Sequence, residues 1–445
     1  MGARAGRLFR PVIDFVTQSK SVLWTSSALA TGQLLSITTA LLTSRLLGPA
    51  GKGLVNAVTT WTQLLCWVSI LGLGKAAQVR IASSSPHGSE RGEAARVSLG
   101  NGLAFALVVG VPVALIGAVT VAHLVAGLAP GAGTLAVWAI VAMPISLMAL
   151  IVSAVQIGLG RRHIFNLAQV ASPAVTLVLT LVFVVVSHLT PGRLVAAFII
   201  GAIVSLIAGA WGLPWGTAAL ELRTFRQDLK FGLRLHAADL LVLTSLRLDV
   251  LVMSALFPAV QIGLYGAANS ALMPVLILTS GSSALLTAKV ANMAASRDPD
   301  VPVLHLQAAA VLREARKYAL VSLAGGVALA ALSPVLVRVV LGSAYGPAVK
   351  LIWILMPGYV CLGFSAIVAA GAEGMRRPWV GVVGETASTI LTLILLPVLL
   401  PRLGAEGAAI ASTAAYGVAA VACAYGLVTI SRRGRTHKAK EEAVV

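Results

Sequence analysis

The chain has 445 residues, of which 58% are apolar and 11% are charged, and it carries a formal net charge of +18. Soluble domains are about 45–50% apolar and about 25% charged, so this composition excludes a soluble enzyme, a disordered protein and a disulfide-stapled secreted module. It predicts an all-α polytopic membrane protein, in which the basic excess lies on loops that face an anionic membrane surface. We expect no nucleic-acid partner.

Twelve apolar runs are long enough to cross a membrane, since one crossing takes roughly 20 residues. They cover approximately residues 22–46, 53–74, 97–126, 133–159, 164–187, 194–217, 235–256, 262–289, 318–340, 350–371, 378–400 and 405–430. Pro49 and the glycines beside it predict a turn between the first two runs.

Lysine and arginine residues divide unequally between the two sides that these runs define. Of the 33, 26 fall on the loops and tails of one side and five on the other, while Arg247 and Arg338 lie within runs. The positive-inside rule therefore predicts that both termini are cytoplasmic. Arg45 and Lys52 flank the first outer turn, where we expect surface charges, with reception of an exiting phosphate as the alternative.

The two halves of the chain repeat one another. Residues 47–57 and 256–267 share a Pro-Ala and a Gly-Leu pair, and the Gly-Arg-Arg of 160–162 is echoed at 374–377, each about 210 residues later. Because six helices separate the copies, the repeats are parallel and predict two six-helix bundles that face one another across a central cavity. The predicted organisation is a cytoplasmic N-tail (1–21), an N-lobe (22–217), a cytoplasmic linker (218–234), a C-lobe (235–430) and a basic cytoplasmic C-tail (431–445).

Four short segments carry a family resemblance, in this order and on these twelve runs. They are the RLLGPAGKGL segment 45–54, the Arg-Leu-Asp of 247–249, the GLYGAA segment 263–268 and the GAEGAAI segment 404–410. Over residues 22–430 the sequence resembles the polysaccharide-biosynthesis flippases (O-antigen and teichoic-acid exporter type) of the multidrug/oligosaccharidyl-lipid/polysaccharide exporter superfamily. Lys52 departs from the family's pattern, in which an aromatic or small polar residue is usual.

The resemblance implies a V-shaped, two-lobed transporter in the bacterial cytoplasmic membrane. It implies alternating-access movement of a polyprenyl-diphosphate-linked oligosaccharide across that membrane, for synthesis of a surface polysaccharide. The partners it implies are this lipid-linked glycan and membrane lipids, with a polysaccharide polymerase or glycosyltransferases as candidate protein partners.

Two related functions stay open as alternatives. A multidrug or organic-cation antiporter of the same superfamily would have an acidic, aromatic cavity, whereas a peptidoglycan lipid-precursor flippase generally has fourteen helices. The sequence has no phosphate-binding Gly-x-x-x-x-Gly-Lys loop, no metal-type His/Cys cluster and no nucleophile elbow. We therefore expect a protein that is not an enzyme and has no cofactor, catalytic residue or metal.

Charges and amides within the apolar runs are the candidate functional residues, because polar groups inside a membrane usually face a cavity or a partner. Asp249 and Glu385 are candidates for ion or proton coupling, with inter-helix bonding as the alternative. Two residues apart on one helix, Arg247 and Asp249 are expected to face different ways. The residues predicted to line a substrate cavity are Arg247, Gln33, Asn56, Gln63, Tyr265 and Asn269. The alternatives are an inter-helix salt bridge for Arg247, bonding between helices for the amides and a place in the helix core or at the membrane interface for Tyr265.

Overall fold

The computed structural model describes residues 2–84, 89–213, 215, 219–295 and 304–442, which form helices and turns with no β-strand. The first half forms α1 (Gly2–Ile70), α2 (Leu73–Ser83), α3 (Glu90–Phe105), η1 (Ala106–Gly110), α4 (Val111–Val125), α5 (Ala132–Val141), α6 (Met143–Gly158), α7 (Arg162–Val186) and α8 (Pro191–Ala210). The second half forms α9 (Leu222–Leu256), α10 (Ala259–Ala295), α11 (Leu304–Leu336), η3 (Val337–Leu341), η4 (Ser343–Tyr345), α12 (Ala348–Gly374), α13 (Trp379–Leu403) and α14 (Ala405–Glu442).

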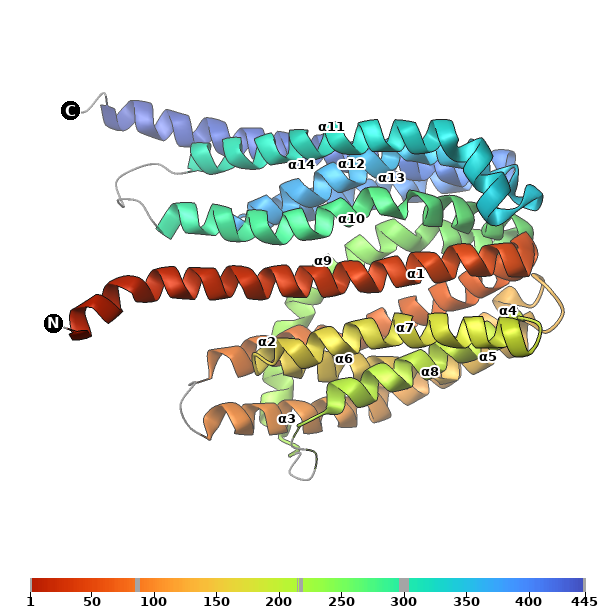
Figure 1. The fold of residues 1–445 in the computed structure, drawn as a ribbon, viewed down its shortest axis with the longest axis horizontal. Coiled ribbons are helices and arrows are strands. Elements are labelled where there is room, and N and C mark those ends of the chain that lie inside the picture. The colour runs from red at the N-terminus through yellow and green to blue at the C-terminus, as the bar shows by residue number, and fades with distance from the viewer. Residues whose placement is uncertain (1, 85–88, 214, 216–218, 296–303, 443–445) are drawn as a thin grey trace.

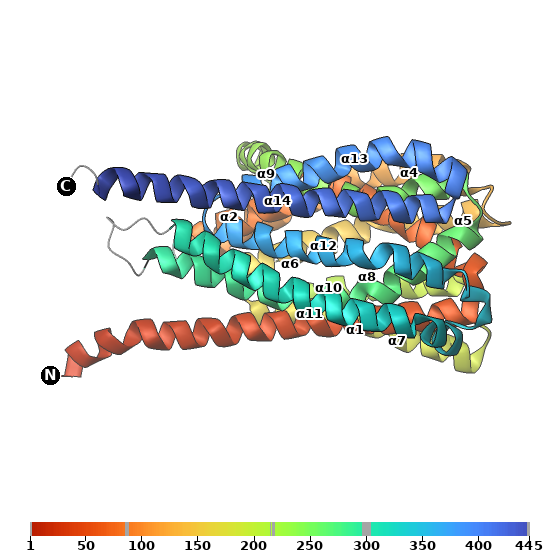
Figure 2. The same ribbon diagram turned by 90° about the horizontal axis from the view of Figure 1, so that it is seen from above.

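The first helix is two helices joined by a reversal at Gly48, whose backbone angles (φ 65°, ψ 177°) are not helical. Glycine tolerates this left-handed φ because it has no Cβ. Residues 2–47 form a first arm that runs to one end of the molecule, and residues 49–70 form a second arm that returns (Figure 1). We call the end that carries this reversal the turn end. Both chain termini lie at the opposite end, the termini end (Figures 1 and 2).

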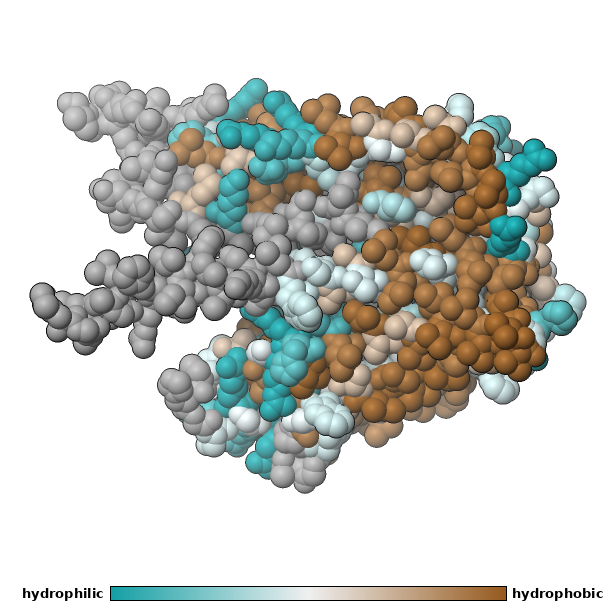
Figure 3. Space-filling model, in the orientation of Figure 1, coloured by the Kyte–Doolittle hydropathy of each residue, from teal (hydrophilic) through white to brown (hydrophobic). Residues whose placement is uncertain are grey.

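The helices are long and apolar enough to make this a multi-pass membrane protein. In the described part of the chain, nine helices meet the length and hydropathy requirements of a membrane span, or ten if one bent pair is counted as a single span. Each of the twelve predicted runs is matched by a helix or a pair of helices, since two of them are the arms of α1 and a third is the second half of α9. The run 194–217 extends beyond α8, which ends at Ala210. Figure 3 shows the resulting belt of apolar side chains, bounded by hydrophilic ones.

Apolar side chains form separate cores in the two halves. One core joins the second arm of α1 to α4, α5, α6 and α8, and is centred on residues such as Leu147 and Ile140. The other joins α10, α12, α13 and α14 around residues such as Leu272 and Leu355. Ala57 is the main first-half residue within the second core. The division into lobes at 22–217 and 235–430 stays a prediction.

Three segments between or after the predicted spans are helical. The basic stretch after the second run forms α2, which bends by 48° from α1 at Leu71 and Gly72. The predicted linker 218–234 is continuous with α9 from residue 222 onward. The C-tail continues α14 as far as residue 442, and residues 443–445 lie outside the described part.

The two lobes contact one another at the turn end. A Cβ built on Gly53 would lie 1.7 Å from the carbonyl oxygen of Ala259 on α10, so the two backbones touch. The Tyr345 hydroxyl donates a hydrogen bond to the Ser44 carbonyl at 2.9 Å, and the Arg45 guanidinium donates to the Val339 carbonyl. These contacts close the molecule at that end.

Candidate functional site

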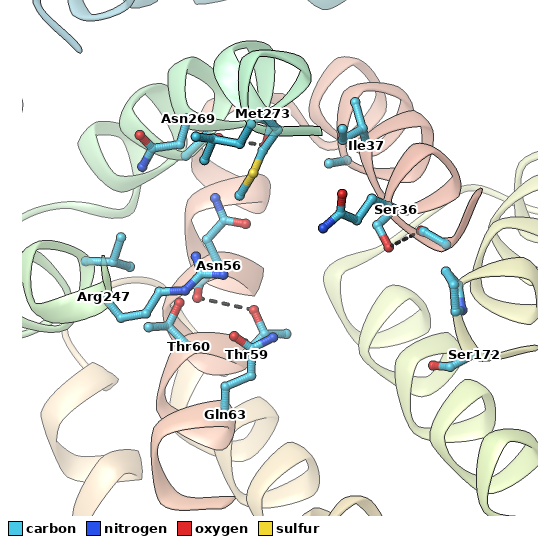
Figure 4. Close-up of a pocket in the computed structure, with 18 of the residues that line it drawn as sticks. Ser36, Ile37, Asn56, Thr59, Thr60, Gln63, Ser172, Arg247, Asn269 and Met273 are labelled. Atoms are coloured by element: carbon cyan, nitrogen blue, oxygen red, sulfur yellow. Dashed lines mark hydrogen bonds between the residues drawn. The ribbon is translucent and has the colours of Figure 1, made fainter. Parts of the chain in front are cut away.

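A cavity of about 750 Å³ lies between the two lobes, on the termini side of these contacts. Both arms of α1 and α7 form its N-lobe wall, and α9 and α10 form its C-lobe wall (Figure 4). Its described polar lining residues are Gln33, Ser36, Asn56, Thr59, Thr60, Gln63, Gln169, Ser172, Arg247, Asn269, Ser270 and Thr279.

Arg247 is the one charged side chain in this described lining, and no carboxylate is part of it. It projects from α9 beside Asn56 and Thr60 of the second arm of α1 (Figure 4). The other polar groups are amides and hydroxyls, which both donate and accept hydrogen bonds. The cavity therefore combines one fixed positive charge with a neutral polar wall.

Close helix packing positions the two asparagines. A Cβ on Gly266 of α10 would lie 1.8 Å from Asn56 Nδ2, so the Asn56 side chain reaches the facing lobe only because position 266 is a glycine. Asn269, one turn further along α10, accepts a hydrogen bond from the Tyr359 hydroxyl at 3.1 Å. Both amides are thus held in place at the cavity wall.

The expectation that Arg247 and Asp249, two residues apart on α9, face different ways is confirmed. Arg247 lines the cavity, whereas Asp249 is 2% exposed and points into the C-lobe. The Asp249 carboxylate accepts hydrogen bonds from the Val250 amide at 2.7 Å, from Ser412 Oγ at 3.0 Å and from the Tyr265 hydroxyl. This network ties α9 to α10 and α14.

Five of the six residues predicted to line a substrate cavity do line this one: Gln33, Asn56, Gln63, Arg247 and Asn269. Whether they contact a substrate stays a prediction. Tyr265 differs, because it is 1% exposed in the C-lobe core and its hydroxyl is bonded to Asp249. A glycan in the cavity would not reach its ring.

The second coupling candidate lies elsewhere in the C-lobe. Glu385 is half-buried on α13, which packs against α14. Asp249 and Glu385 are therefore both within the C-lobe helix bundle rather than in the cavity lining. No cluster of three His, Cys, Asp or Glu side chains that fits a metal ion occurs in the described ranges.

Sequence reasoning misplaced one charge and missed several hydroxyls. Lys52, expected as a surface charge, is 5% exposed between the arms of α1. The hydroxyls of Thr59, Thr60 and Ser172 line the cavity but carry no sequence signal, because serine and threonine are common in membrane helices. The helical spacing of Asn56, Thr59, Thr60 and Gln63 is the one pattern that predicts a shared polar face.

Known proteins of similar fold are transporters. An inward-facing multidrug resistance MATE family transporter of the MOP superfamily matches with a TM-score of 0.75 at 16% identity, over 93% of this chain and 99% of that chain. The lipid II flippase MurJ in an inward closed conformation also matches at 0.75, with 13% identity over 93% and 91% of the two chains. The eukaryotic MATE transporter AtDTX14 matches at 0.64, with 15% identity over 95% and 99%.

Sequence comparison assigns the family. No curated protein matches the chain significantly. The family described as polysaccharide biosynthesis protein matches residues 19–286, which run from the first arm of α1 through most of α10 and include Arg247. The chain is therefore a multi-pass membrane protein of the polysaccharide biosynthesis protein family, with the fold of the MOP-superfamily transporters.

Proposed function

We propose that the protein is a flippase that moves a polyprenyl-diphosphate-linked oligosaccharide across the cytoplasmic membrane by alternating access. The single positive charge of Arg247 within an otherwise neutral, hydrogen-bonding cavity is the observation that carries this proposal. A diphosphate buried in such a cavity needs a cation to offset its lost hydration. Sugar hydroxyls both donate and accept hydrogen bonds, and the surrounding amides and hydroxyls can do the same.

The charge of the cavity disfavours the cation-transporter alternative. A drug or organic-cation antiporter needs acidic groups facing its substrate, and the described lining holds none. A peptidoglycan lipid-precursor flippase fits the cavity charge equally well, because its cargo is also a lipid-linked diphosphate. The fold similarity to the lipid II flippase MurJ is consistent with this second candidate.

We further propose that the termini end faces the cytoplasm, as the charge distribution predicts. The lobes touch at the turn end through Gly53 and Ala259, and through Tyr345 and Ser44. With this orientation the structure corresponds to an inward-facing state, closed toward the outside. Export then requires these contacts to separate. Asp249 and Glu385 remain the proposed coupling groups, because they are C-lobe carboxylates within the helix bundle.

The test is mass spectrometry of polyprenyl-diphosphate-linked sugars in a strain that lacks this gene. The proposal predicts accumulation of one completed repeat unit and loss of the matching surface polymer. Complementation with the wild type and with Arg402→Gln, an exposed arginine of α13 outside the cavity, should restore export. Arg247→Gln should not. Accumulation of a peptidoglycan precursor would favour the second candidate, and an unchanged lipid-linked pool with new sensitivity to cationic dyes would reject both.

A further inference from the structure

Lys52 is a buried cation without an anionic partner in the described part of the chain. Its side chain lies between the arms of α1, 5% exposed, and its ammonium donates one hydrogen bond, to Thr43 Oγ1 at 3.2 Å. The ion pairs found among the described residues do not include it. An ammonium has three donors, so two of them remain for another acceptor.

Lys52 lies in the first turn of the second arm of α1, directly after the reversal at Gly48, and its ammonium reaches Thr43 near the end of the first arm. The positive end of one arm and the negative end of the other lie together here, so the helix dipoles do not replace an anionic partner. A buried cation within a membrane protein is expected to face a cavity or an anion.

A small recess beside Lys52 has room for such an anion. It measures about 130 Å³ and is lined by Ser36, Thr39, Ala40, Thr43, Lys52, Ser172, Pro173, Thr176 and Phe198. A water molecule takes about 30 Å³, so the recess can hold a carboxylate or phosphate group. Four of its hydroxyls donate to carbonyls of their own helices: Ser36 to Gly32, Thr39 to Leu35, Thr43 to Thr39 and Thr176 to Ser172. Among the described residues, the donors left for a ligand are those of the ammonium and the Ser172 hydroxyl.

The recess adjoins the main cavity. Ser36, Ala40, Ser172 and Pro173 line both spaces. Figure 4 shows Ser36 and Ser172 on the N-lobe side of the cavity, across from Arg247 on the C-lobe side. A ligand that fills the cavity could therefore place one group against Arg247 and a second in the recess.

We propose that the Lys52 recess binds an oxyanion of the cargo, so that each lobe contributes one cation to an anionic headgroup. The oxyanion is a carboxylate of an acidic sugar or a phosphate of the lipid diphosphate. This inference rests on the proposed function for the identity of the cargo. Its structural consequence is that a doubly anionic headgroup bridges the N-lobe and the C-lobe.

The test uses the full chain in lipid nanodiscs and three probes at matched ionic strength: pyrophosphate, glucuronate and chloride. The readout is the thermal unfolding midpoint, which rises when a ligand binds the folded state. We expect pyrophosphate or glucuronate to raise the wild-type midpoint more than chloride does. Lys52→Met should bind that probe about tenfold or more weakly, as expected on loss of a charge-assisted hydrogen bond, and Lys52→Arg should retain part of the effect.

The matched control is Lys350→Met, because Lys350 is an exposed lysine of the turn end paired with Glu406 at 2.7 Å. It should keep the full response to the probe. A response to glucuronate would assign the recess to an acidic sugar, and a response to pyrophosphate alone would assign it to the diphosphate. The proposal is overturned if Lys52→Met responds like the wild type, or if neither oxyanion exceeds chloride in the wild type.

Failure of this inference and failure of the proposed function give different results. Suppose that the strain lacking the gene accumulates a lipid-linked glycan but Lys52→Met keeps the wild-type response to the probe. The proposed flippase function then holds, and the proposed oxyanion site at Lys52 is rejected. If Lys52→Met loses the response while the lipid-linked pool of the deletion strain is unchanged, the oxyanion site stands and its ligand is not a flipped glycan. Lys52→Met should fold, because replacement of an unpaired buried charge by an apolar side chain is neutral or stabilising.

Discussion

Gly53 and Gly263 occupy reciprocal positions at the turn end. A Cβ on Gly53 would lie 1.7 Å from the carbonyl oxygen of Ala259, and a Cβ on Gly263 would lie 1.8 Å from the carbonyl oxygen of Pro49. These four residues are the Pro-Ala and Gly-Leu positions through which the two halves of the sequence resemble one another. The repeated motif therefore packs against its own copy.

Substitution of either glycine should separate the lobes at the turn end. In Gly53→Ala the added methyl group would overlap a backbone oxygen that cannot rotate away, so we expect a shift toward a state open at this end and loss of export. Spin labels at positions 50 and 260, in a background without the three native cysteines, would report the separation. Gly325→Ala is the control, since a Cβ there meets nothing within 4 Å. An unchanged distance in Gly53→Ala would contradict the closing role of this contact.

Tyr265→Phe should destabilise the C-lobe without changing the cavity. It removes one of three hydrogen bonds to the buried Asp249 carboxylate, and a lost bond to a buried polar group costs about 1–3 kcal/mol. We expect a lower thermal unfolding midpoint and unchanged export per folded molecule. Tyr425→Phe is the control, because that tyrosine is 74% exposed. A large loss of export at a wild-type midpoint would instead place Tyr265 in the transport cycle.

Asp249→Asn and Glu385→Gln test the coupling proposal. If one of these carboxylates binds the coupling ion or proton, its amide variant should lose the dependence of export on external pH or sodium and should export more slowly. Liposomes with imposed ion gradients provide the measurement. Glu406→Gln is the control, since that carboxylate lies at the turn end and pairs with Lys350. Full export by Asp249→Asn at every pH and sodium concentration would remove Asp249 from the coupling role.

Arg80 and Asp228 should contribute unequally to stability. They pair at 3.2 Å where α2 meets the polar half of α9. Burial raises the pKa of the Asp228 carboxyl and the Arg80 charge opposes that rise only in part. The folded state therefore binds the proton more tightly than the unfolded state, so stability falls as pH rises from the unfolded pKa, near 3.9, through the raised folded one.

It follows that Asp228→Asn should raise the unfolding midpoint at neutral pH, with a smaller gain at acidic pH. Arg80→Met should lower the midpoint, because it leaves a buried carboxylate without its cation. Thermal unfolding of both variants in nanodiscs at two pH values measures this. Equal losses in both variants at neutral pH would contradict the assignment.

The sequence predicted the helices and the orientation of α9 because these depend on local patterns. Apolar runs identify the helices, and the two-residue spacing of Arg247 and Asp249 is enough to send one into the cavity and the other into the C-lobe. The partners of Asp249 were not predictable in this way. Ser412 lies 163 residues away in the chain, and only the packing of α14 against α9 brings it to 3.0 Å.

Lys52 shows that assigning a charge to a loop from the sequence does not establish that its side chain is exposed. Its position next to a Gly-Pro turn suggests a surface residue, but the reversal at Gly48 begins a new helix within three residues and folds Lys52 back toward Thr43. Tyr265 shows the converse. Its aromatic ring, at a motif position, suggested a contact with a sugar. In the structure its hydroxyl instead donates a hydrogen bond to the Asp249 carboxylate of the neighbouring helix α9.

The continuity of α9 affects how the lobes can move. This helix has 35 residues, and its first part crosses the bundle while its second part runs along it (Figures 1 and 2). Its polar half packs on the N-lobe through Phe225 and Leu229, and its membrane half belongs to the C-lobe core through Val250 and Met253. The link between the lobes is thus helical rather than an extended loop. A tilt of the C-lobe would be transmitted through α9 to α2, because the two helices touch where a Cβ on Gly72 would lie 2.2 Å from the Gly232 carbonyl oxygen.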